Sequence, residues 1–362
     1  MDVSSDENWH VLLSLFPENW RELAKNTKAM VRKFRNFSCE EKLMRTLLLH
    51  IACGYSLRET TVRAKASNIA DVSDVALLKR LKLSENWFKA LSFSLLEERG
   101  PVEKIKVKKN ICMKLVDATI VKEPGKTGSS WRIHYSLKLP ELNCDYFKLT
   151  GVKGQGTGES FKQFPIQNND CIIGDRGYST AQGIAYVASQ GAYSLVRINT
   201  NAVNFYSKDL QSFNLLDNIN AVNTVFLMKS WDVLVKSADG HHITGRLCVI
   251  RKTEAAIAQA LKRLKREASK RQSELKPGTI EYAKYIIVFT TLSVRDFSTK
   301  EVLDWYRLRW QIELVFKRLK SLAGLGHLPK YDEGSARAWL HAKLFVGLMI
   351  EKLIRYSSDF SP

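Results

Sequence analysis

A change in hydrophobic periodicity near residue 106 constrains the fold of this chain more than any other feature of its sequence. Residues 7 to about 100 repeat apolar side chains at helical spacing, for example in the stretch 40–50, which has Ser38 as a candidate N-cap. After residue 106, short apolar and β-prone runs alternate with polar turns and with single helical stretches. We therefore expect a helical N-terminal part followed by an α/β part.

The order of elements in the α/β part can be predicted from the same patterns. We expect strands at residues 111–116, 131–139, 145–152, 171–173, 193–198, 223–228, 232–236, 242–250 and 285–292, and helices at residues 179–190, 298–322 and 337–356. Three spaced glycines, Gly154, Gly156 and Gly158, indicate a loop between the third and fourth strands.

The charge balance favours a polyanionic partner. The 362 residues include 56 Lys and Arg against 37 Asp and Glu, a formal net charge of +19. Such an excess is typical of proteins that bind nucleic acid or, less often, an anionic membrane; a basic protein without such a partner is the alternative. Residues 251–276 hold nine basic side chains against three acidic ones. We interpret this stretch as a helix that contacts a phosphate backbone, with a solvated surface helix as the alternative, and we expect Pro277 and Gly278 to end it.

Several classes of protein are disfavoured. No stretch of about 18 uncharged apolar residues occurs, so we expect no membrane span. The acidic and polar start of the chain does not resemble a secretory signal. The six cysteines are scattered without a CxxC pair, so we expect reduced thiols in a cytosolic protein and neither a zinc site nor a disulfide framework.

Two short helices in the N-terminal part resemble a helix-turn-helix. Ser56 and Glu59 have the spacing of a capping box and open a helix that ends near Ala66. A polar turn leads to a second helix at residues 74–81, which carries basic side chains on one side. This pattern is typical of DNA-binding helix pairs, and an ordinary helical hairpin remains open as the alternative.

Three acidic residues occupy positions that could carry chemistry. Asp117 lies on or at the end of the apolar strand that begins at residue 111, and Asp175 follows the strand 171–173. Glu313 lies inside the helix expected at residues 298–322. An aspartate at the end of a strand is often only a turn residue, and a glutamate on a helix is usually solvated, so none of the three is decisive alone.

The neighbours of Glu313 change this interpretation. Tyr306, Arg309, Glu313 and Lys320 would all fall on one side of a continuous helix, at about 100° per residue. A carboxylate flanked by two cations and a phenol suits a divalent metal ion together with a phosphodiester. The carboxylate binds the metal ion, whereas the cations and the phenol bind phosphate oxygens.

These four residues match the Tyr-Arg-Glu-Lys signature of bacterial insertion-sequence transposases of the DDE type. The chain resembles this family over residues 38 to about 355. Four further blocks carry the resemblance: residues 115–119 and 175–178, which contain the two aspartates, and residues 157–160 and 74–81. The four-residue signature is the most specific of these matches.

The resemblance implies a fold and a division into domains. The fold would be α/β, with a ribonuclease-H-like catalytic core that has Asp117 on its central first strand, Asp175 at the end of a neighbouring strand and Glu313 on a later helix. The implied parts are an N-terminal helical DNA-binding domain (1–105), the first part of the core (106–200), a β-rich insertion with a basic helix (201–285) and the second part of the core (286–362). In this branch of the family the insertion contacts the transposon end.

The resemblance also implies an activity. The enzyme would bind transposon ends, cleave them as a metal-dependent endonuclease and join the freed 3′-OH to target DNA. Asp117, Asp175 and Glu313 would hold two Mg²⁺ ions, for which Mn²⁺ can substitute. The implied DNA contacts are Tyr306, Arg309, Lys320, Arg176 and Tyr178. The implied partners are double-stranded DNA and a second copy of the chain in the DNA complex, in the bacterial cytoplasm at the nucleoid and without a membrane.

Two other functions remain open at this stage. One is a metal-dependent nuclease of the same fold without strand transfer, as in a domesticated or defective copy. The other is a DNA-binding regulator built on the N-terminal helices. The presence of all three carboxylates together with Arg309 and Lys320 argues against the regulator.

Overall fold

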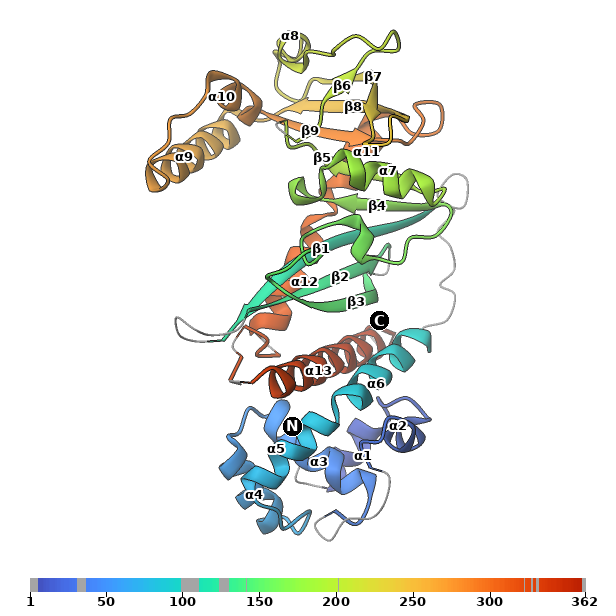
Figure 1. Ribbon diagram of the computed structural model, residues 1–362, viewed down its shortest axis with the longest axis vertical. Helices are drawn as coiled ribbons and strands as arrows, with labels where there is room; N and C mark the ends of the chain where they lie inside the picture. The colour runs from blue at the N-terminus through green and yellow to red at the C-terminus, as the bar shows by residue number, and fades with distance from the viewer. Residues whose placement is uncertain are drawn as a thin grey trace.

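The computed structural model describes residues 6–359, apart from residues 31–36, 99–110, 124–129, 141, 201, 322, 327, 330 and 331. Along the long axis, helices occupy one end, a sheet occupies the middle, and the last strands of that sheet with a helical arm occupy the other end (Figure 1). The expected domain boundary between residues 105 and 106 lies outside the described residues, as does residue 201, where we expect the insertion to begin.

The described helices of the first hundred residues pack around aromatic side chains. They are α1 (Asp6–Leu13), α2 (Trp20–Asn26), α3 (Glu40–Ile51), α4 (Leu57–Ala66), α5 (Asp74–Leu83) and α6 (Glu85–Glu97). Trp9, Trp20 and Trp87 are buried between them, and the indole N–H of Trp87 donates to the carbonyl oxygen of Trp20 at 3.0 Å. The helical nature of the N-terminal part is therefore confirmed.

Two of these helices test the expected caps. Ser56 caps α4, since its hydroxyl accepts a hydrogen bond from the amide of Glu59 at 3.1 Å. For α3 the expected cap is wrong by one residue: Cys39, not Ser38, is the N-cap, and its side chain makes no capping hydrogen bond. Two glutamates in the first turn of α3 supply the negative charge that favours a helix start.

Nine strands in the described part of the chain form one mixed sheet, in the order β3-β2-β1-β4-β5-β9-β8-β7-β6. They are β1 (Cys112–Lys122), β2 (Ser130–Lys138), β3 (Asn143–Gly151), β4 (Asp170–Gly174), β5 (Tyr193–Arg197), β6 (Phe205–Tyr206), β7 (Met228–Lys236), β8 (His242–Arg251) and β9 (Tyr285–Thr290). β4 pairs in parallel with β1 and with β5, and all other pairs are antiparallel. The expected α/β class is confirmed, and β6 to β8 continue the sheet begun by β1 to β5.

The register between β1 and β4 brings the two aspartates together. Leu115 pairs with Ile173 in the parallel ladder. The same register, continued by two residues, leads from Asp117 to Asp175, and the charge of Asp175 raises the pKa of Asp117. β1 runs on to Lys122, so Asp117 lies within its strand, whereas β4 ends at Gly174 and Asp175 begins the turn that follows.

Helices cover both faces of the sheet. On one face, Leu115 belongs to the same core as buried residues of α11 (Thr299–Arg307) and α12 (Trp310–Ser321). On the other face, Val116 belongs to a core that includes α7 (Ala181–Ser189) and α8 (Leu215–Ile219). Side chains alternate along a strand, so Asp117 shares the face of Leu115, on which α12 packs.

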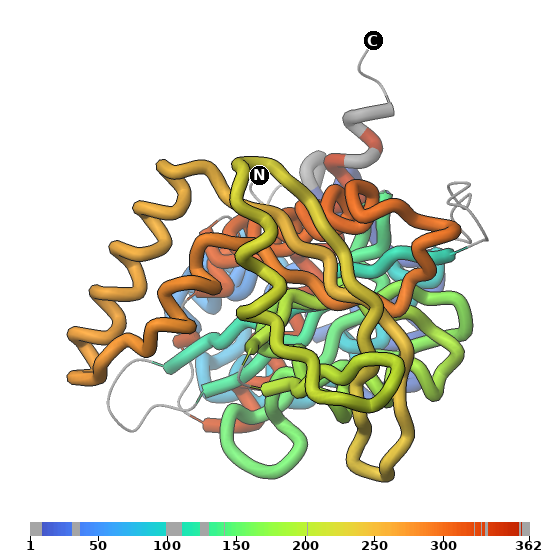
Figure 2. The backbone as a smooth tube through the Cα atoms, turned by 90° about the horizontal axis from the view of Figure 1, so that it is seen from above, coloured from blue at the N-terminus to red at the C-terminus, as the bar shows by residue number. Residues whose placement is uncertain are grey.

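Three further helices do not cover the faces of the sheet: two form an arm, and one connects the sheet to the N-terminal helices. α9 (Glu254–Lys270) and α10 (Pro277–Ala283) form an arm beside the body of the molecule, and α9 projects outward in both views (Figures 1 and 2). α13 (Glu333–Asp359) packs against α3, α5 and α6 and also against β3, so it connects the N-terminal helices to the sheet. Within the described ranges, no helix is long and apolar enough to cross a membrane.

Three local expectations are wrong. Residues 223–227 are not a strand: they include a turn in which Phe226 adopts a left-handed φ of 64°, and the strand begins only at Met228. The helix expected at residues 298–322 is two helices, because Leu308 and Arg309 form a tight turn with hydrogen bonds to the third preceding residue. Pro277 starts α10 and does not end the basic helix α9, which ends at Lys270. Proline is favoured at the start of a helix because the backbone N–H groups of the first turn have no partner within the helix, so the missing N–H of proline costs nothing there.

A buried ion pair fastens the strands that carry the aspartates. Nζ of Lys114 on β1 is 2.9 Å from Oδ2 of Asp170 on β4 and 3.4 Å from Oδ2 of Asp145 on β3. The side chains of Lys114 and Asp170 are 11% and 4% exposed. Removal of one partner would leave the other charge buried without its counter-ion, which is strongly unfavourable.

We expect Lys114→Met to lower the free energy of unfolding by about 3–5 kcal/mol, because Asp170 would lose its cation in a buried position. The double variant Lys114→Met/Asp170→Asn should recover part of this loss. Urea unfolding followed by circular dichroism measures both. Lys300→Met, which removes a largely exposed pair with Asp304, is the control and should cost less than about 1 kcal/mol. Equal losses for Lys114→Met and Lys300→Met would contradict this account.

Candidate active site

Asp117 and Asp175 are each anchored by a backbone amide. The Asp117 side chain is 15% exposed, and the amide of Ala118 donates to its Oδ1 at 2.7 Å. Asp175 begins a 3₁₀ turn in which the amide of Gly177 donates to its Oδ1 at 2.7 Å. The backbone therefore fixes the two carboxylates that the strand register sets side by side.

Arg309 joins Asp117 to Glu313. Its guanidinium hydrogen-bonds to the Glu313 carboxylate, and its Nη1 lies 3.9 Å from Oδ2 of Asp117. Arg309 is 17% exposed, whereas Glu313 is 56% exposed. The turn between α11 and α12 carries Arg309, so these residues meet through a turn and not through one continuous helix.

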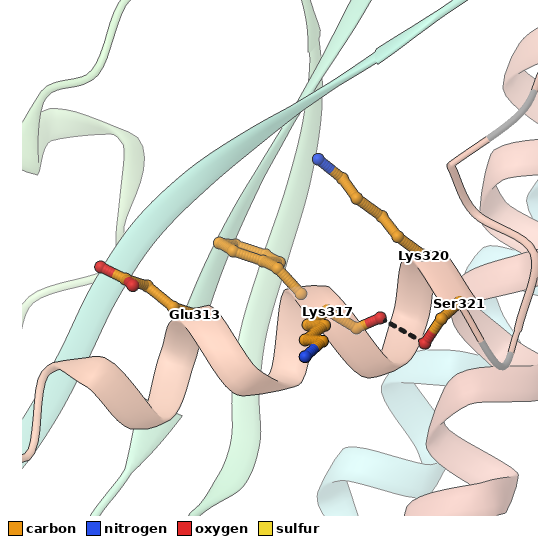
Figure 3. Close-up of a pocket in the computed structure, with 5 residues that line it drawn as sticks. Glu313, Lys317, Lys320 and Ser321 are labelled. Carbon is orange, nitrogen blue, oxygen red and sulfur yellow. Dashed lines mark hydrogen bonds between the residues drawn. The ribbon is translucent and has the colours of Figure 1, made fainter.

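Glu313 and Lys320 share one side of α12. They line a hollow of about 510 Å³ that is open to solvent, together with Phe316, Lys317 and Ser321. In Figure 3, Glu313 and Lys320 extend to the same side of the helix, whereas Lys317 points in another direction. The expected helix face is therefore confirmed for Glu313 and Lys320.

Tyr306 lies on α11, before the turn, and is 8% exposed. Burial raises the pKa of its phenol; the charges of Arg309 and Arg197 oppose this rise, and that of Asp175 adds to it. Charges act this strongly only over short distances, so Tyr306 lies near Arg309, Arg197 and Asp175. The expected helix face is thus wrong for Tyr306, but the fold still brings this side chain to the site, as a buried residue.

A cationic cluster of Arg176, Arg197, Lys252 and Arg263 lies next to Asp175. Packing against the protein and the charges of Arg197 and Arg263 lower the pKa of the Arg176 guanidinium, although the side chain reaches solvent. Burial and the charges of Arg197 and Arg176 lower the pKa of Lys252 to about 8. Within the described chain, Nε of Arg197 is buried and makes no hydrogen bond. Cations gathered in this way repel one another and favour the binding of an anion.

The Asp117 carboxyl has a strongly shifted pKa. Burial raises the pKa of Asp117 to about 7, and the charges of Asp175 and Glu159 add to the rise, while the amide of Ala118 and the charge of Arg309 oppose it. In the metal-free protein, the protonated and ionised forms of Asp117 therefore coexist near neutral pH. Perturbed pKa values of this kind are typical of functional sites.

Glu159 is a fourth carboxylate at this site, which the sequence alone did not identify as functional. Packing against the protein and the charge of Asp175 raise the pKa of Glu159, and Arg132 opposes the shift. A Cβ atom added at Gly177 would overlap Oε2 of Glu159 and would lie 3.1 Å from Oδ1 of Asp175. The available sequence signal is a glutamate that directly follows three spaced glycines, in the loop before the strand of Asp175.

Tyr178, expected to contact DNA, is 1% exposed. Its hydroxyl is buried and has no hydrogen-bond partner among the described residues. Burial raises the pKa of Tyr178, and the charges of Asp117, Glu159 and Asp175 add to the shift. A direct contact with a surface phosphate does not fit this position, since the ring is buried and stacks on Phe161.

The donor set fits a divalent metal ion. Carboxylate oxygens are the ligands that Mg²⁺ prefers, and the buried Tyr178 hydroxyl beside them lacks a partner. Over the residues that the structure describes, no three acidic, histidine or cysteine side chains converge closely enough to hold a metal ion as they stand. Glu313 pairs with Arg309 instead, so a metal ion at the aspartates would compete with Arg309 for Glu313.

Comparisons with known proteins show which family the chain is similar to. The family described as Transposase DDE domain matches residues 155–349. The chain is 30% identical to the putative transposase InsL for insertion sequence element IS186A of Escherichia coli and to the transposase for insertion sequence element IS421 of the same species, in each case over 99% of this chain and 97% of the relative. The transposase for insertion sequence element IS231F of Bacillus thuringiensis subsp. israelensis is 24% identical over 91% of this chain and 75% of that protein.

Among solved structures, the catalytic domain of human Endonuclease V resembles the chain weakly. The TM-score is 0.29 and the identity 8%, over 66% of this chain and 96% of that chain. A TM-score of this size does not establish a shared fold.

In metal-free buffer, we expect Asp117→Asn to raise the thermal unfolding midpoint more near pH 8 than near pH 5. The folded-state pKa of Asp117, about 7, lies above the ordinary value of 3.8. The native protein therefore binds a proton that the unfolded chain releases, and its stability falls as the pH rises from about 4 to about 7. Asparagine avoids this loss. Differential scanning fluorimetry in EDTA measures the effect, with Asp304→Asn as the control. An equal change at both pH values for Asp117→Asn would contradict the shifted pKa.

Proposed function

The chain belongs to the family of transposases with a DDE domain and is a DNA transposase, and we propose that Asp117, Asp175 and Glu313 are its catalytic carboxylates. The observation that carries this proposal is the parallel register of β1 and β4, which sets Asp117 beside Asp175. Arg309 supports it further, since it links Asp117 to Glu313.

We propose a ribonuclease-H-like core formed by β1 to β5 with α12. The order β3-β2-β1-β4-β5, with antiparallel pairs followed by parallel ones, supports this assignment. On this basis residues 106–200 and 286–362 contribute the core, and residues 201–285 are the insertion that carries the basic helix α9. Residues 1–105 are the DNA-binding domain, in which α4 and α5 act as a helix-turn-helix.

Transposases with a DDE domain generally depend on a divalent metal ion. We assign two Mg²⁺ ions, replaceable by Mn²⁺, to Asp117, Asp175 and Glu313. When bound, such ions activate the attacking hydroxyl group and stabilise the leaving 3′-oxygen. Glu313 must leave Arg309 to take part, and the freed guanidinium is then available to a phosphate oxygen.

The remaining basic side chains supply the DNA contacts. Arg309 and Lys320 lie on either side of Glu313 in the sequence and contact phosphates beside the scissile bond. Arg176 and the rest of the cationic cluster contact phosphates further along the strand. Tyr306 supports Arg309 from the protein interior, in keeping with its burial.

The order of events follows from the chemistry. The enzyme cleaves the transposon end first, and the freed 3′-OH then attacks target DNA, so double-stranded DNA is the partner in both steps. A second copy of the chain would hold the other transposon end in a homodimeric complex. Because the substrate is DNA, we expect this action in the bacterial cytoplasm at the nucleoid.

Asp117→Asn, Asp175→Asn and Glu313→Gln should each slow Mg²⁺-dependent cleavage of transposon-end DNA by about 1000-fold or more, because each removes a metal ligand that stabilises the transition state by several kcal/mol. Binding of the same DNA in a gel-shift assay should survive, since the phosphate contacts are cationic. Asp304→Asn on α11 is the matched control and should cleave normally.

Cleavage at the wild-type rate by any of the three variants would remove that residue from the site. A strand-transfer assay with pre-cleaved ends separates the remaining alternatives. Joining to target DNA is expected, and cleavage without joining would indicate a nuclease.

Arg176→Gln and Arg197→Gln should each reduce the slope of log binding constant against log salt concentration by about 1, because each removes one phosphate contact. Fluorescence anisotropy with end DNA over a salt series measures the slope. Arg295→Gln is the control, since Arg295 is exposed and follows β9, which runs antiparallel to β5, so it lies at the opposite edge of the sheet. Unchanged slopes for Arg176→Gln and Arg197→Gln would contradict the role of the cationic cluster.

A further inference from the structure

Building on the proposed function, we infer that Glu159 is a fourth carboxylate ligand of the metal site, on the side of Asp175. It lies in the loop between β3 and β4, outside the three residues that we assign to the catalytic set. The inference is carried by the position of its side chain, by the shape of the backbone at Gly177 and by the unpartnered Tyr178 hydroxyl.

The loop that carries Glu159 is held at its backbone. The guanidinium of Arg132 on β2 hydrogen-bonds to the carbonyl oxygen of Thr157, and the side-chain amide of Gln163 hydrogen-bonds to that of Gly156. No hydrogen bond or ion pair within the described ranges uses the Glu159 carboxylate itself. The loop is therefore fixed, while the carboxylate at its end remains available to a ligand.

Gly177 gives the Glu159 carboxylate its position. A side chain at residue 177 would overlap Oε2 of Glu159 and crowd Oδ1 of Asp175, at 3.1 Å from the added Cβ. Oxygens from two different carboxylates thus border the same small space, which exists because residue 177 has no side chain. Two carboxylates held together in this way repel each other unless a cation lies between or beside them.

The Tyr178 hydroxyl lies close enough to these carboxylates for their charges to act on it. It is buried and unpartnered in the described part of the chain, and the three carboxylates that act on it are Asp117, Glu159 and Asp175. A buried hydroxyl without a partner is costly. A ligand held by these carboxylates, or a carboxylate oxygen reoriented by that ligand, would provide the missing partner.

The four carboxylates divide into two pairs. Asp117 and Glu313 share Arg309, whereas Asp175 and Glu159 share the space beside Gly177 and have no ion pair with any described residue. Asp175 and Glu159 lack the ion pair that Arg309 gives the other two carboxylates, so we expect a metal ion to bind first beside them. Once a metal ion draws them together, Glu159, Asp175 and Asp117 would supply three carboxylates without requiring Glu313 to leave Arg309.

The test is Mn²⁺ binding to the full chain in the absence of DNA, measured by electron paramagnetic resonance of free Mn²⁺. Glu159→Gln should weaken binding by about 10-fold or more, and Asp175→Asn should do the same. Glu313→Gln should change Mn²⁺ affinity less than about threefold, since Glu313 is engaged with Arg309. Glu18→Gln makes the same chemical change at an exposed site in the N-terminal part and is the control.

A second variant tests the geometry independently. Gly177→Ala should displace the Glu159 carboxylate and weaken Mn²⁺ binding. The double variant Glu159→Gln/Gly177→Ala should weaken Mn²⁺ binding by less than the product of the two single effects, since both substitutions disturb the same ligand. Circular dichroism and the unfolding midpoint confirm that each variant is folded.

The inference is overturned if Glu159→Gln binds Mn²⁺ within about threefold of the wild type, or if the wild-type chain binds no Mn²⁺ without DNA. The proposed function is judged separately, by cleavage with Asp117→Asn and Asp175→Asn. Loss of cleavage in those variants with normal Mn²⁺ binding by Glu159→Gln would leave the function standing and remove only Glu159.

Discussion

Repulsion between carboxylates gathered in a partly buried place is the constraint around which this site is arranged. Burial is the main reason that the pKa of Asp117 is raised to about 7, and the charges of Asp175 and Glu159 add to the rise. Backbone amides anchor two of these side chains, and Arg309 partly neutralises Asp117. A divalent cation relieves the same repulsion far better than a single guanidinium, so the strain in the metal-free site favours metal binding.

The rest of the fold keeps these charges in place. Parallel pairing of β1 with β4 brings the two aspartates towards each other. The buried ion pair between Lys114 and Asp170 links the same two strands closer to their N-terminal ends. The tight turn between α11 and α12 presents Arg309 to Asp117. Within the sheet, β9 joins β5 to β8, so β6 to β8 extend the same sheet that carries the strands of the site (Figure 1).

The sequence predicted the elements of this fold better than their junctions. Short apolar and β-prone runs located β1, β4, β5 and β9, and alternation located β2, because strands buried in a sheet are rich in such residues. The break at Leu308 could not be predicted, since the residues around it are good helix formers and tertiary contacts decide where the turn occurs. The burial of Tyr178 and the proximity of Glu159 were also beyond reach, because both depend on how the loop after β3 folds back over Gly177. The signature residues could be recognised, but their meeting through a turn could not.

The central claim is that Asp117, Asp175 and Glu313 hold the metal ions of a DNA transposase, and its most direct test is anomalous diffraction from Mn²⁺ in crystals of the complex with transposon-end DNA. The account predicts Mn²⁺ bound by oxygens of Asp117 and Asp175, with Glu313 released from Arg309 and turned towards the metal. Mn²⁺ bound elsewhere in the chain would contradict this claim. So would a complex that cleaves DNA and holds Mn²⁺ at the aspartates while Glu313 remains paired with Arg309.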